Sequence, residues 1–218
     1  GQGRRMGSGK NKLLLELGGE PILVHTLERL QASPLIDEIV LVAGLEEIPF
    51  WTERMELPHR FSKLSALVSG GAERQDSVFR GLKAVSPQAE WVGVHDGARP
   101  FITDKELESV IRAAQSCQAA LLAVPVKETI KRVHDNKVDA TLERSALWAA
   151  QTPQVFARSL IIEAYHVAER DGYCGTDDAS LVERLGVEVT IVQGSYRNIK
   201  ITTPEDLWVA RTLWRQEQ

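Results

Sequence analysis

The sequence predicts an α/β fold: a Rossmann-like, mostly parallel twisted sheet with helices on both faces and a protruding β-arm. Two observations predict this class. Short apolar segments alternate with amphipathic segments along the 218 residues, and polar segments that contain glycine follow several of the apolar ones. Such alternation is typical of parallel strands joined by helices, with a ligand site at the carboxyl ends of the strands. We expect a single domain over residues 1–218.

The predicted strands are short runs of Val, Ile, Leu and Ala, the composition of strands that are buried on both faces. In chain order they cover residues 36–43, 66–68, 91–94, 119–126 and 187–192. The predicted helices carry apolar residues at helical spacing. They cover residues 21–31, 77–84, 103–117, 157–170 and 204–216. Two helix starts are marked: Thr103 and Glu106 form a capping box, and Thr203 precedes a proline at the first helical position.

Residues 126–147 depart from this alternation. Polar and apolar residues alternate around Ile130 and Val133, and Asp135-Asn136 follows, a pair typical of a tight turn. The pattern predicts an antiparallel arm. Because such an arm commonly grips a second subunit, we expect a homodimer.

Composition limits the functional classes. The formal net charge of −4 argues against a nucleic-acid binder, which usually carries a positive excess. No apolar run approaches the roughly 18 residues of a membrane span, so we expect no membrane partner. Cys117 and Cys174 lie far apart and form no C-x-x-C pair, which favours free thiols in a reducing compartment. No signal peptide is visible, and the expected location is the cytoplasm.

Fixed positive charge is interleaved with glycine at the start of the sequence. Gly1, Gly3, Arg5 and Lys12 belong to a segment whose main-chain N–H groups can approach an anion closely while the cations neutralise a polyphosphate. Met6 occupies the third glycine position of a dinucleotide-binding fingerprint, and the spacing of a P-loop is also absent. A basic terminus without a ligand is the alternative for this segment taken alone.

Single cations recur in polar segments farther along the chain, among them Arg74, Arg99, Arg144 and Lys200. Isolated cations of this kind suit a small anionic ligand, and solvated surface charge is the alternative for each one taken alone. Four polar segments are expected at the carboxyl ends of strands, the first two following strands and the last two ending strands. They are residues 69–74, 95–100, 151–154 and 194–200.

Seven motifs in order extend over nearly the whole chain. They are G-x-G-x-R-M…K at 1–12, G-G-x-x-R-x-x-S-V at 70–78, H-D-G-A-R-P at 95–100, V-K-E-T-I-K at 126–131, E-R-S-x-L-W-A-x-Q-T-P-Q at 143–154, T-D-D-A-S at 176–180 and N-I-K-x-T-T-P-E-D-L at 198–207. The first motif alone is similar to many sugar nucleotidyltransferases. Together the seven resemble the 2-C-methyl-D-erythritol 4-phosphate cytidylyltransferase family, whose fold is of the nucleotide-diphospho-sugar transferase type.

The resemblance implies a reaction. The phosphate of methylerythritol phosphate attacks the α-phosphorus of CTP in line, pyrophosphate leaves, and 4-diphosphocytidyl-2-C-methyl-D-erythritol forms, with Mg²⁺ on the triphosphate. This is a step of isoprenoid precursor synthesis by the non-mevalonate route. Because the attacking phosphate is already an anion, no general base is required, and catalysis depends on positioning and charge neutralisation. His95 is therefore expected to be a structural imidazole rather than a catalyst.

The resemblance also implies site residues, motif by motif. The implied catalytic residues are Arg5, Lys12, Arg144 and Lys200. The implied nucleotide-binding residues are Gly1, Gly3, Lys12, Gly71, Arg74, Ser77 and Asp96. The implied acceptor-binding residues are Asp96, Arg99, Thr129, Arg144, Thr152 and Lys200. Of these, Thr129 and Arg144 would reach the neighbouring subunit's site from the arm, and Asp96 would reach the metal through water.

The sequence departs from the family pattern in three places. The family begins with a strand and a Pro-Ala-Ala-Gly turn, so we expect that strand to be missing from this sequence. Asn11 stands where proline is common, which makes Lys10 a second candidate for the role of Lys12. Ala72 stands where aspartate is common, so no side-chain contact to the nucleotide is expected there.

Rival functions remain open. A cytidylyltransferase for another polyol phosphate, such as ribitol 5-phosphate, would share the glycine loop and differ around Thr152 and Lys200. A non-catalytic nucleotide-binding relative is disfavoured because Arg5, Lys12, Asp96 and Lys200 are all present. A dinucleotide-dependent reductase is disfavoured by the absent fingerprint.

Overall fold

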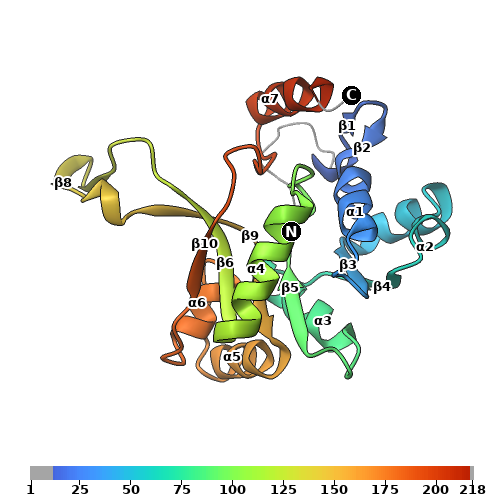
Figure 1. Cartoon of the computed structure of the whole chain (residues 1–218), viewed down its shortest axis with the longest axis horizontal. Helices are drawn as coiled ribbons and strands as arrows, with labels where there is room; N and C mark the ends of the chain where they lie inside the picture. Colours follow the sequence, from blue (N-terminus) through green and yellow to red (C-terminus); the bar gives the residue numbers. More distant parts are fainter. Residues whose placement is uncertain (1–11, 217–218) are drawn as a thin grey trace.

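The structure is a computed structural model that describes residues 12–216. Its centre is a four-stranded sheet in the order β10-β6-β9-β5. These strands are Thr190–Gln193 (β10), Ala119–Pro125 (β6), Trp148–Ala157 (β9) and Trp91–Val94 (β5). A second, two-stranded sheet pairs Ile39–Ala43 (β3) with Leu64–Ser69 (β4) in parallel. Helices surround the strands in Figure 1, and the predicted α/β class is confirmed.

Helices cover both faces of the central sheet, as predicted. Alternate residues of β6 pack on opposite sides, because successive side chains of a strand point to opposite faces. Ala120 and Leu122 contact the apolar face of α4 (Asp104–Cys117). Ala119 and Leu121 belong to the cluster on the other face. That cluster is built by three helices, α3 (Arg74–Ala84), α5 (Arg158–Arg170) and α6 (Asp178–Glu183).

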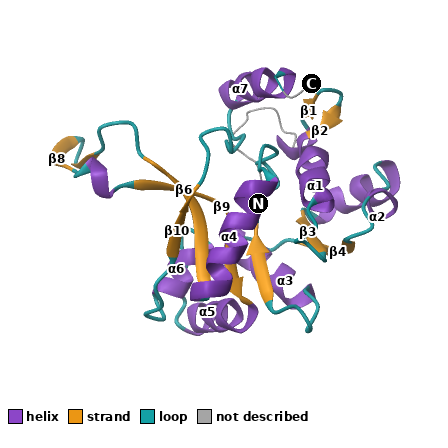
Figure 2. Cartoon of the chain, viewed as in Figure 1, coloured by secondary structure: helices purple, strands orange, loops and turns teal. Residues whose placement is uncertain are grey.

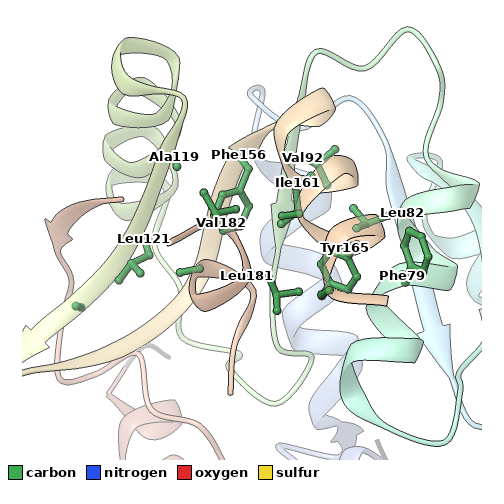
Figure 3. Close-up of a cluster of buried hydrophobic side chains, with 14 residues drawn as sticks. Phe79, Leu82, Val92, Ala119, Leu121, Phe156, Ile161, Tyr165, Leu181 and Val182 are labelled. Carbon is green, nitrogen blue, oxygen red and sulfur yellow. The ribbon is translucent and has the colours of Figure 1, made fainter. Parts of the chain in front are cut away.

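The larger cluster holds α3 and α5 together beneath the sheet (Figure 3). Tyr165 of α5 stacks on Phe79 of α3, with ring centroids 5.4 Å apart. Phe156 of β9 and Ile161 of α5 are fully buried beside them. This packing fixes α3 relative to the sheet.

β9 is absent from the predicted strands. It runs antiparallel to both β6 and β5, whereas β6 and β10 are parallel to each other. The prediction that residues 151–154 end a strand is therefore wrong, because these residues lie within β9. The cause is composition. Gln151, Thr152 and Gln154 are buried although they are polar, so the segment lacks the apolar run by which the other strands were found.

The smaller sheet has its own core beneath α1 (Ile22–Ala32). Trp51, which is fully buried, lies in a turn of π-helix over Phe50–Arg54 (η4), and a short helix over Leu57–Arg60 (α2) follows it. A turn of 3₁₀ helix over Leu45–Glu47 (η3) leads from β3 into this segment. The sequence patterns indicated none of these three elements, because each is too short to show a helical period.

Capping residues set the helix starts. In α4 the Glu106 N–H donates to the Thr103 hydroxyl oxygen at 3.3 Å, and the Thr103 N–H donates to the Glu106 carboxylate at 3.0 Å, which confirms the predicted capping box. The C-terminal helix, Pro204–Arg215 (α7), begins after Thr203 as predicted. α3 begins three residues before the predicted 77–84, because the carboxylate of Asp76 caps the N–H of Glu73.

The described chain begins with a turn of 3₁₀ helix, Lys12–Leu14 (η2), and a small hairpin of Glu16–Leu17 (β1) and Glu20–Pro21 (β2). α7 packs on this hairpin: a Cβ added at Gly18 would lie 2.4 Å from the Trp214 Nε1 atom. Gly18 also has a φ of +63°, so two independent constraints require glycine there.

The segment predicted as an arm contains an exposed antiparallel hairpin, Lys131–His134 (β7) and Lys137–Thr141 (β8). Asp135 and Asn136 form its turn, with φ of 49° and 59°. A 3₁₀ turn over Arg144–Ala146 (η5) returns the chain to β9. Figure 2 shows the hairpin extending away from the body of the molecule. Among the described residues, no helix has both the length and the apolar composition needed to cross a bilayer.

Candidate active site

Three polar segments meet beside the end of β5, with Asp96 at their centre. The Asp96 carboxylate lies 2.8 Å from the Lys200 ammonium nitrogen, 3.6 Å from Arg99 Nε and 4.0 Å from Arg74 Nε. Arg74 follows β4, Arg99 follows β5 and Lys200 follows β10. The structure thus brings together four of the residues that the sequence motifs single out, from positions more than a hundred residues apart.

Main-chain hydrogen bonds place these side chains. The Arg99 N–H donates to the Asp96 carbonyl at 3.0 Å, which closes a turn directly after β5. The Ile201 N–H donates to the Ala98 carbonyl at 2.9 Å, which ties the segment that carries Lys200 to the same turn. These main-chain hydrogen bonds therefore form a backbone junction that holds the charged side chains close together, in addition to the ion pairs between them.

Asn198 strengthens this junction from inside. Its side chain is fully buried, and its amide nitrogen donates to the Thr152 carbonyl at 3.0 Å. Its main-chain carbonyl accepts from Arg99 Nη1 at 2.6 Å. One residue thus connects the middle of β9 to the turn after β5 and to the segment of Lys200.

The cluster attracts anions. Burial disfavours the charged carboxylate of Asp96, but Lys200, followed by Arg74 and Arg99, more than offsets this and holds the pKa of Asp96 below its ordinary value. Burial lowers the pKa of the Arg99 guanidinium, and the attraction of Asp96 opposes that shift. With Asp178, which pairs with Arg74, three cations face two carboxylates. The remaining positive charge suits phosphate oxygens.

Arg74 is held from behind by the carboxylate of Asp178, which is fully buried. Arg74 Nη1 and Nη2 donate to the two Asp178 oxygens at 3.1 and 2.6 Å, a bidentate pair. The Tyr165 hydroxyl also donates to Asp178, at 2.5 Å. Burial opposes the charge on Arg74, but its bonds to Asp178 raise the pKa of the guanidinium above its ordinary value. Burial, reinforced by Asp178, raises the pKa of Tyr165.

The loop before α3 is shaped by Gly71 and Ser77. The Ser77 hydroxyl accepts from the Gly71 N–H at 3.0 Å and donates to the Glu73 carbonyl at 2.9 Å. A Cβ added at Gly71 would lie 2.3 Å from the Cβ of Asp76, so the loop cannot close in this way with a larger residue. Within the described structure, Ser77 uses its hydroxyl to form the loop that carries Arg74.

Thr152 and His95 lie behind Asp96. The Asp96 N–H donates to the Thr152 hydroxyl oxygen at 2.9 Å, and that oxygen lies 3.1 Å from His95 Nδ1. His95 Nε2 lies 3.2 Å from the Arg99 carbonyl oxygen. Removal from water lowers the pKa of His95 from 6.5 to about 4, so the imidazole is neutral at physiological pH.

This shift predicts a loss of stability in mild acid. Between pH 6.5 and about 4 the unfolded chain binds a proton at His95 that the native protein does not bind. His95 therefore leaves the free energy of unfolding undiminished above pH 6.5, and it lowers that free energy as the pH falls toward 4. The pKa shift of His95 corresponds to a decrease of up to about 3 kcal/mol in the free energy of unfolding across this pH range.

Urea unfolding of the wild type and of His95→Gln at several pH values measures this effect. We expect the free energy of unfolding to fall in the wild type across this window, and to fall less in His95→Gln. Equal slopes for both proteins would show that His95 is not the group responsible.

The structure does not bring Thr129 and Arg144 to the cluster of their own chain. Both are exposed, and both lie in the arm region. Arg144 Nη1 donates to the Lys127 carbonyl at 3.0 Å, at the base of the arm. The arm region that carries them extends away from the body of the molecule (Figure 1).

The remaining predicted site residues lie at the start of the sequence. Gly1, Gly3 and Arg5, together with the alternative Lys10, lie outside the described residues. Lys12 opens η2.

Sequence reasoning missed several residues that build the site. Asp178 and Asn198 stand in the motifs T-D-D-A-S and N-I-K-x-T-T-P-E-D-L, but the sequence alone indicates no role for either residue. Tyr165 looked like an ordinary apolar residue of a helix. The only available signal was the paired carboxylates of T-D-D-A-S, because two adjacent acidic residues before a buried helix need partners.

The fold and this anion-attracting junction define the class of the protein, an α/β nucleotidyltransferase. The sequence matches the family model of 2-C-methyl-D-erythritol 4-phosphate cytidylyltransferase over residues 1–216. The chain belongs to this family.

Relatives and solved structures agree with this assignment. The chain is 51% identical over 219 residues to the 2-C-methyl-D-erythritol 4-phosphate cytidylyltransferase of Syntrophus aciditrophicus, with 100% of this chain and 94% of the relative covered. The crystal structure of 4-diphosphocytidyl-2C-methyl-D-erythritol synthase from Anaerococcus prevotii superposes with a TM-score of 0.86 at 33% identity, covering 97% and 93% of the two chains. The cytidylyltransferase structure from Thermus thermophilus has a TM-score of 0.81 at 34% identity, covering 94% of each chain.

Proposed function

We propose that Lys200, Arg99 and Arg74, gathered around Asp96, bind the phosphates of CTP and of 2-C-methyl-D-erythritol 4-phosphate, and that the chain transfers the cytidylyl group between them. The observation that carries the proposal is the convergence of these cations on one carboxylate, at 2.8, 3.6 and 4.0 Å. Membership of the family supplies the identity of both substrates. The ribitol phosphate and non-catalytic alternatives are not favoured by that membership.

The acceptor phosphate attacks the α-phosphorus of CTP in line, and pyrophosphate departs. The nucleophile is already an anion, so the site needs cations rather than a base. His95 agrees with this requirement, since the imidazole lies behind Asp96 and both ring nitrogens have partners within the protein. Lys200 neutralises charge at the α-phosphate under attack, and Arg5 and Lys12 neutralise the departing pyrophosphate.

The other predicted residues divide by position. Gly71, Arg74 and Ser77, with Gly1 and Gly3, serve the nucleotide. Arg99 serves the acceptor, and Asp96 stands between the two and orients Lys200.

Mg²⁺ is proposed to arrive on the triphosphate rather than in a cage of protein ligands. Among residues 12–216, no group of three or more His, Cys, Asp or Glu side chains could hold a metal ion. Asp96 offers a carboxylate at the site, and its oxygens already face cations. This fits an ion whose ligands are mostly phosphate oxygens and water, as is usual for Mg²⁺ with nucleotides. When bound, the ion would neutralise phosphate charge.

Pyrophosphate release tests the function directly. The purified chain is mixed with CTP and Mg²⁺ and with methylerythritol phosphate, ribitol 5-phosphate or no acceptor. We expect release with methylerythritol phosphate alone. Release only with ribitol 5-phosphate would change the assigned acceptor. If protein whose folding is verified by circular dichroism released no pyrophosphate with either acceptor, the proposal would be contradicted.

The arm is proposed to form a homodimer, with Thr129 and Arg144 completing the partner's site. The exposed apolar side chains of the hairpin support an occupied surface there: Val133 and Val138 are 56% and 62% exposed. We also propose a location in the cytoplasm, because both cysteines, Cys117 and Cys174, are free thiols, as is usual in a reducing compartment.

Mixing two inactive variants tests the shared site. Arg144→Ala and Arg5→Ala are each expected to be nearly inactive as homodimers. A dimer with one subunit of each kind has one site that carries neither change, so an equimolar mixture after subunit exchange is expected to regain about a quarter of the wild-type rate, because half of the dimers are then mixed and hold one intact site each. A mixture that stays as inactive as its parents, although exchange is shown by mass labelling, would rule out sharing.

A further inference from the structure

The hydrogen bonds between His95 and Thr152 have a defined direction. The Arg99 carbonyl oxygen can only accept, so His95 Nε2, which lies 3.2 Å away, must carry the hydrogen. In a neutral imidazole the other nitrogen then has no hydrogen and accepts. The Thr152 hydroxyl, 3.1 Å from Nδ1, must therefore donate to it.

The same reasoning fixes the oxygen of Thr152. It accepts from the Asp96 N–H at 2.9 Å, while its single hydrogen points to His95. The side chain is 5% exposed. A hydroxyl with its hydrogen already placed has none to offer to a phosphate oxygen.

The hydrogen bonds that run from Asp96 through Thr152 and His95 to Arg99 begin and end on the same turn, residues 96–99. Asp96 supplies the N–H at one end, Arg99 supplies the carbonyl at the other, and the Arg99 N–H closes the turn on the Asp96 carbonyl at 3.0 Å. The turn therefore has three bonds that fix its shape, two of which pass through Thr152 and His95. The side chains of Asp96 and Arg99, the first and last residues of the turn, both belong to the charged cluster.

We propose that His95 and Thr152 are positioning residues that hold the Asp96–Arg99 turn, and that Thr152 donates no hydrogen bond to the acceptor phosphate. This inference rests on the proposed function for the role of Asp96 and Arg99, and it replaces the direct phosphate contact that the family resemblance implies for Thr152. His95 acts through the turn and takes no part in proton transfer.

The first test reads the imidazole directly and needs no catalysis. Long-range ¹H–¹⁵N correlation spectra of the histidine rings are recorded at pH 7.5 on the labelled wild type, and the His95 signals are identified by their loss in His95→Gln. We expect a neutral ring with its hydrogen on Nε2. A hydrogen on Nδ1, or a charged imidazolium, would overturn the proposal.

The second test is kinetic and uses matched variants. Thr152→Ser keeps the hydroxyl, whereas Thr152→Val removes it at nearly constant volume. His95→Asn keeps an acceptor near the position of Nδ1, whereas His95→Gln keeps a donor near the position of Nε2 and loses the bond to Thr152. We expect Thr152→Ser to remain within about threefold of the wild-type kcat/KM, and Thr152→Val and His95→Gln to lose about tenfold or more, each with a lower kcat.

The double variant separates positioning from direct contact. If both residues act through one turn, Thr152→Val combined with His95→Gln is expected to be about as active as the weaker single variant. A direct phosphate contact from Thr152 would instead raise the KM for the acceptor alone, and its loss would multiply with that of His95→Gln. That second pattern would overturn the inference.

Failure of the inference and failure of the function are distinguishable. If the wild type releases no pyrophosphate, the proposed function fails, while the ring spectra still decide the hydrogen-bond direction. If the wild type is active and the variants follow the direct-contact pattern, the function stands and the positioning role falls.

Discussion

Lys200→Ala is expected to lower kcat by two to three orders of magnitude and to change the free energy of unfolding little. Removing one charged or hydrogen-bonding group aimed at a transition state costs about 3–4 kcal/mol of barrier. The ammonium nitrogen of Lys200 lies 2.8 Å from Asp96, and the side chain is 36% exposed in a loop, so the fold does not depend on it. Steady-state kinetics with CTP and methylerythritol phosphate, beside urea unfolding, measures both quantities.

Two further variants control this experiment. Lys105→Ala removes an exposed lysine of α4 and is expected to leave kcat unchanged. Lys200→Arg keeps the charge but alters its shape, and is expected to fall between Lys200→Ala and the wild type. If Lys200→Ala lost stability in proportion to activity, Lys200 would have to be reassigned to the structural residues.

Asp178→Asn is expected to destabilise the protein by about 3 kcal/mol, because it breaks the bidentate pair between Arg74 and a fully buried carboxylate. Asp178 is fully buried, and it accepts two bonds from Arg74 and one from the Tyr165 hydroxyl. For a chain of this length the change corresponds to a fall in Tm of about 6–12 °C. Thermal unfolding followed by circular dichroism measures it.

An exposed pair provides the matched comparison. Asp139→Asn breaks the contact between Asp139 and Arg132 on the arm, and both of these side chains are exposed. It is expected to leave Tm nearly unchanged, since exposed ion pairs contribute little. A fall in Tm no larger for Asp178→Asn than for Asp139→Asn would mean that the buried pair adds nothing to stability.

The fold could be predicted where each element has one dominant pattern. β6 is an unbroken run of apolar residues because helices cover both of its faces, and α4 has a capping box at its start. β9 could not be found, because its central residues are polar and have their partners on distant segments. The Gln154 side chain, for example, bonds with Asp177 and with the N–H of Ala179. Only the folded structure shows that these polar groups are satisfied.

The charged residues of the site could be predicted from the sequence, but the buried residues that hold them in place could not. Asp96, Arg99 and Lys200 were found because they lie in motifs that follow strands. Asp178 and Asn198 are bonded to other protein groups, and nothing in their spacing in the sequence indicates which cation or carbonyl each one contacts. Thr152 shows the limit most clearly: its motif implies a ligand contact, and only the structure shows its hydrogen bonds to Asp96 and His95.

The hydrogen bond between Ile201 and Ala98 links the C-terminal helix to the loop that carries Lys200. Ile201 is fully buried in the same cluster as Ala210 of α7, and three residues separate Lys200 from the first residue of that helix. A shift of α7 would pull directly on the loop of Lys200. Affinity tags, fusions and surface tethers attached beyond residue 218 should therefore carry a flexible spacer, and immobilisation through the exposed Trp208 side of α7 is the attachment to avoid.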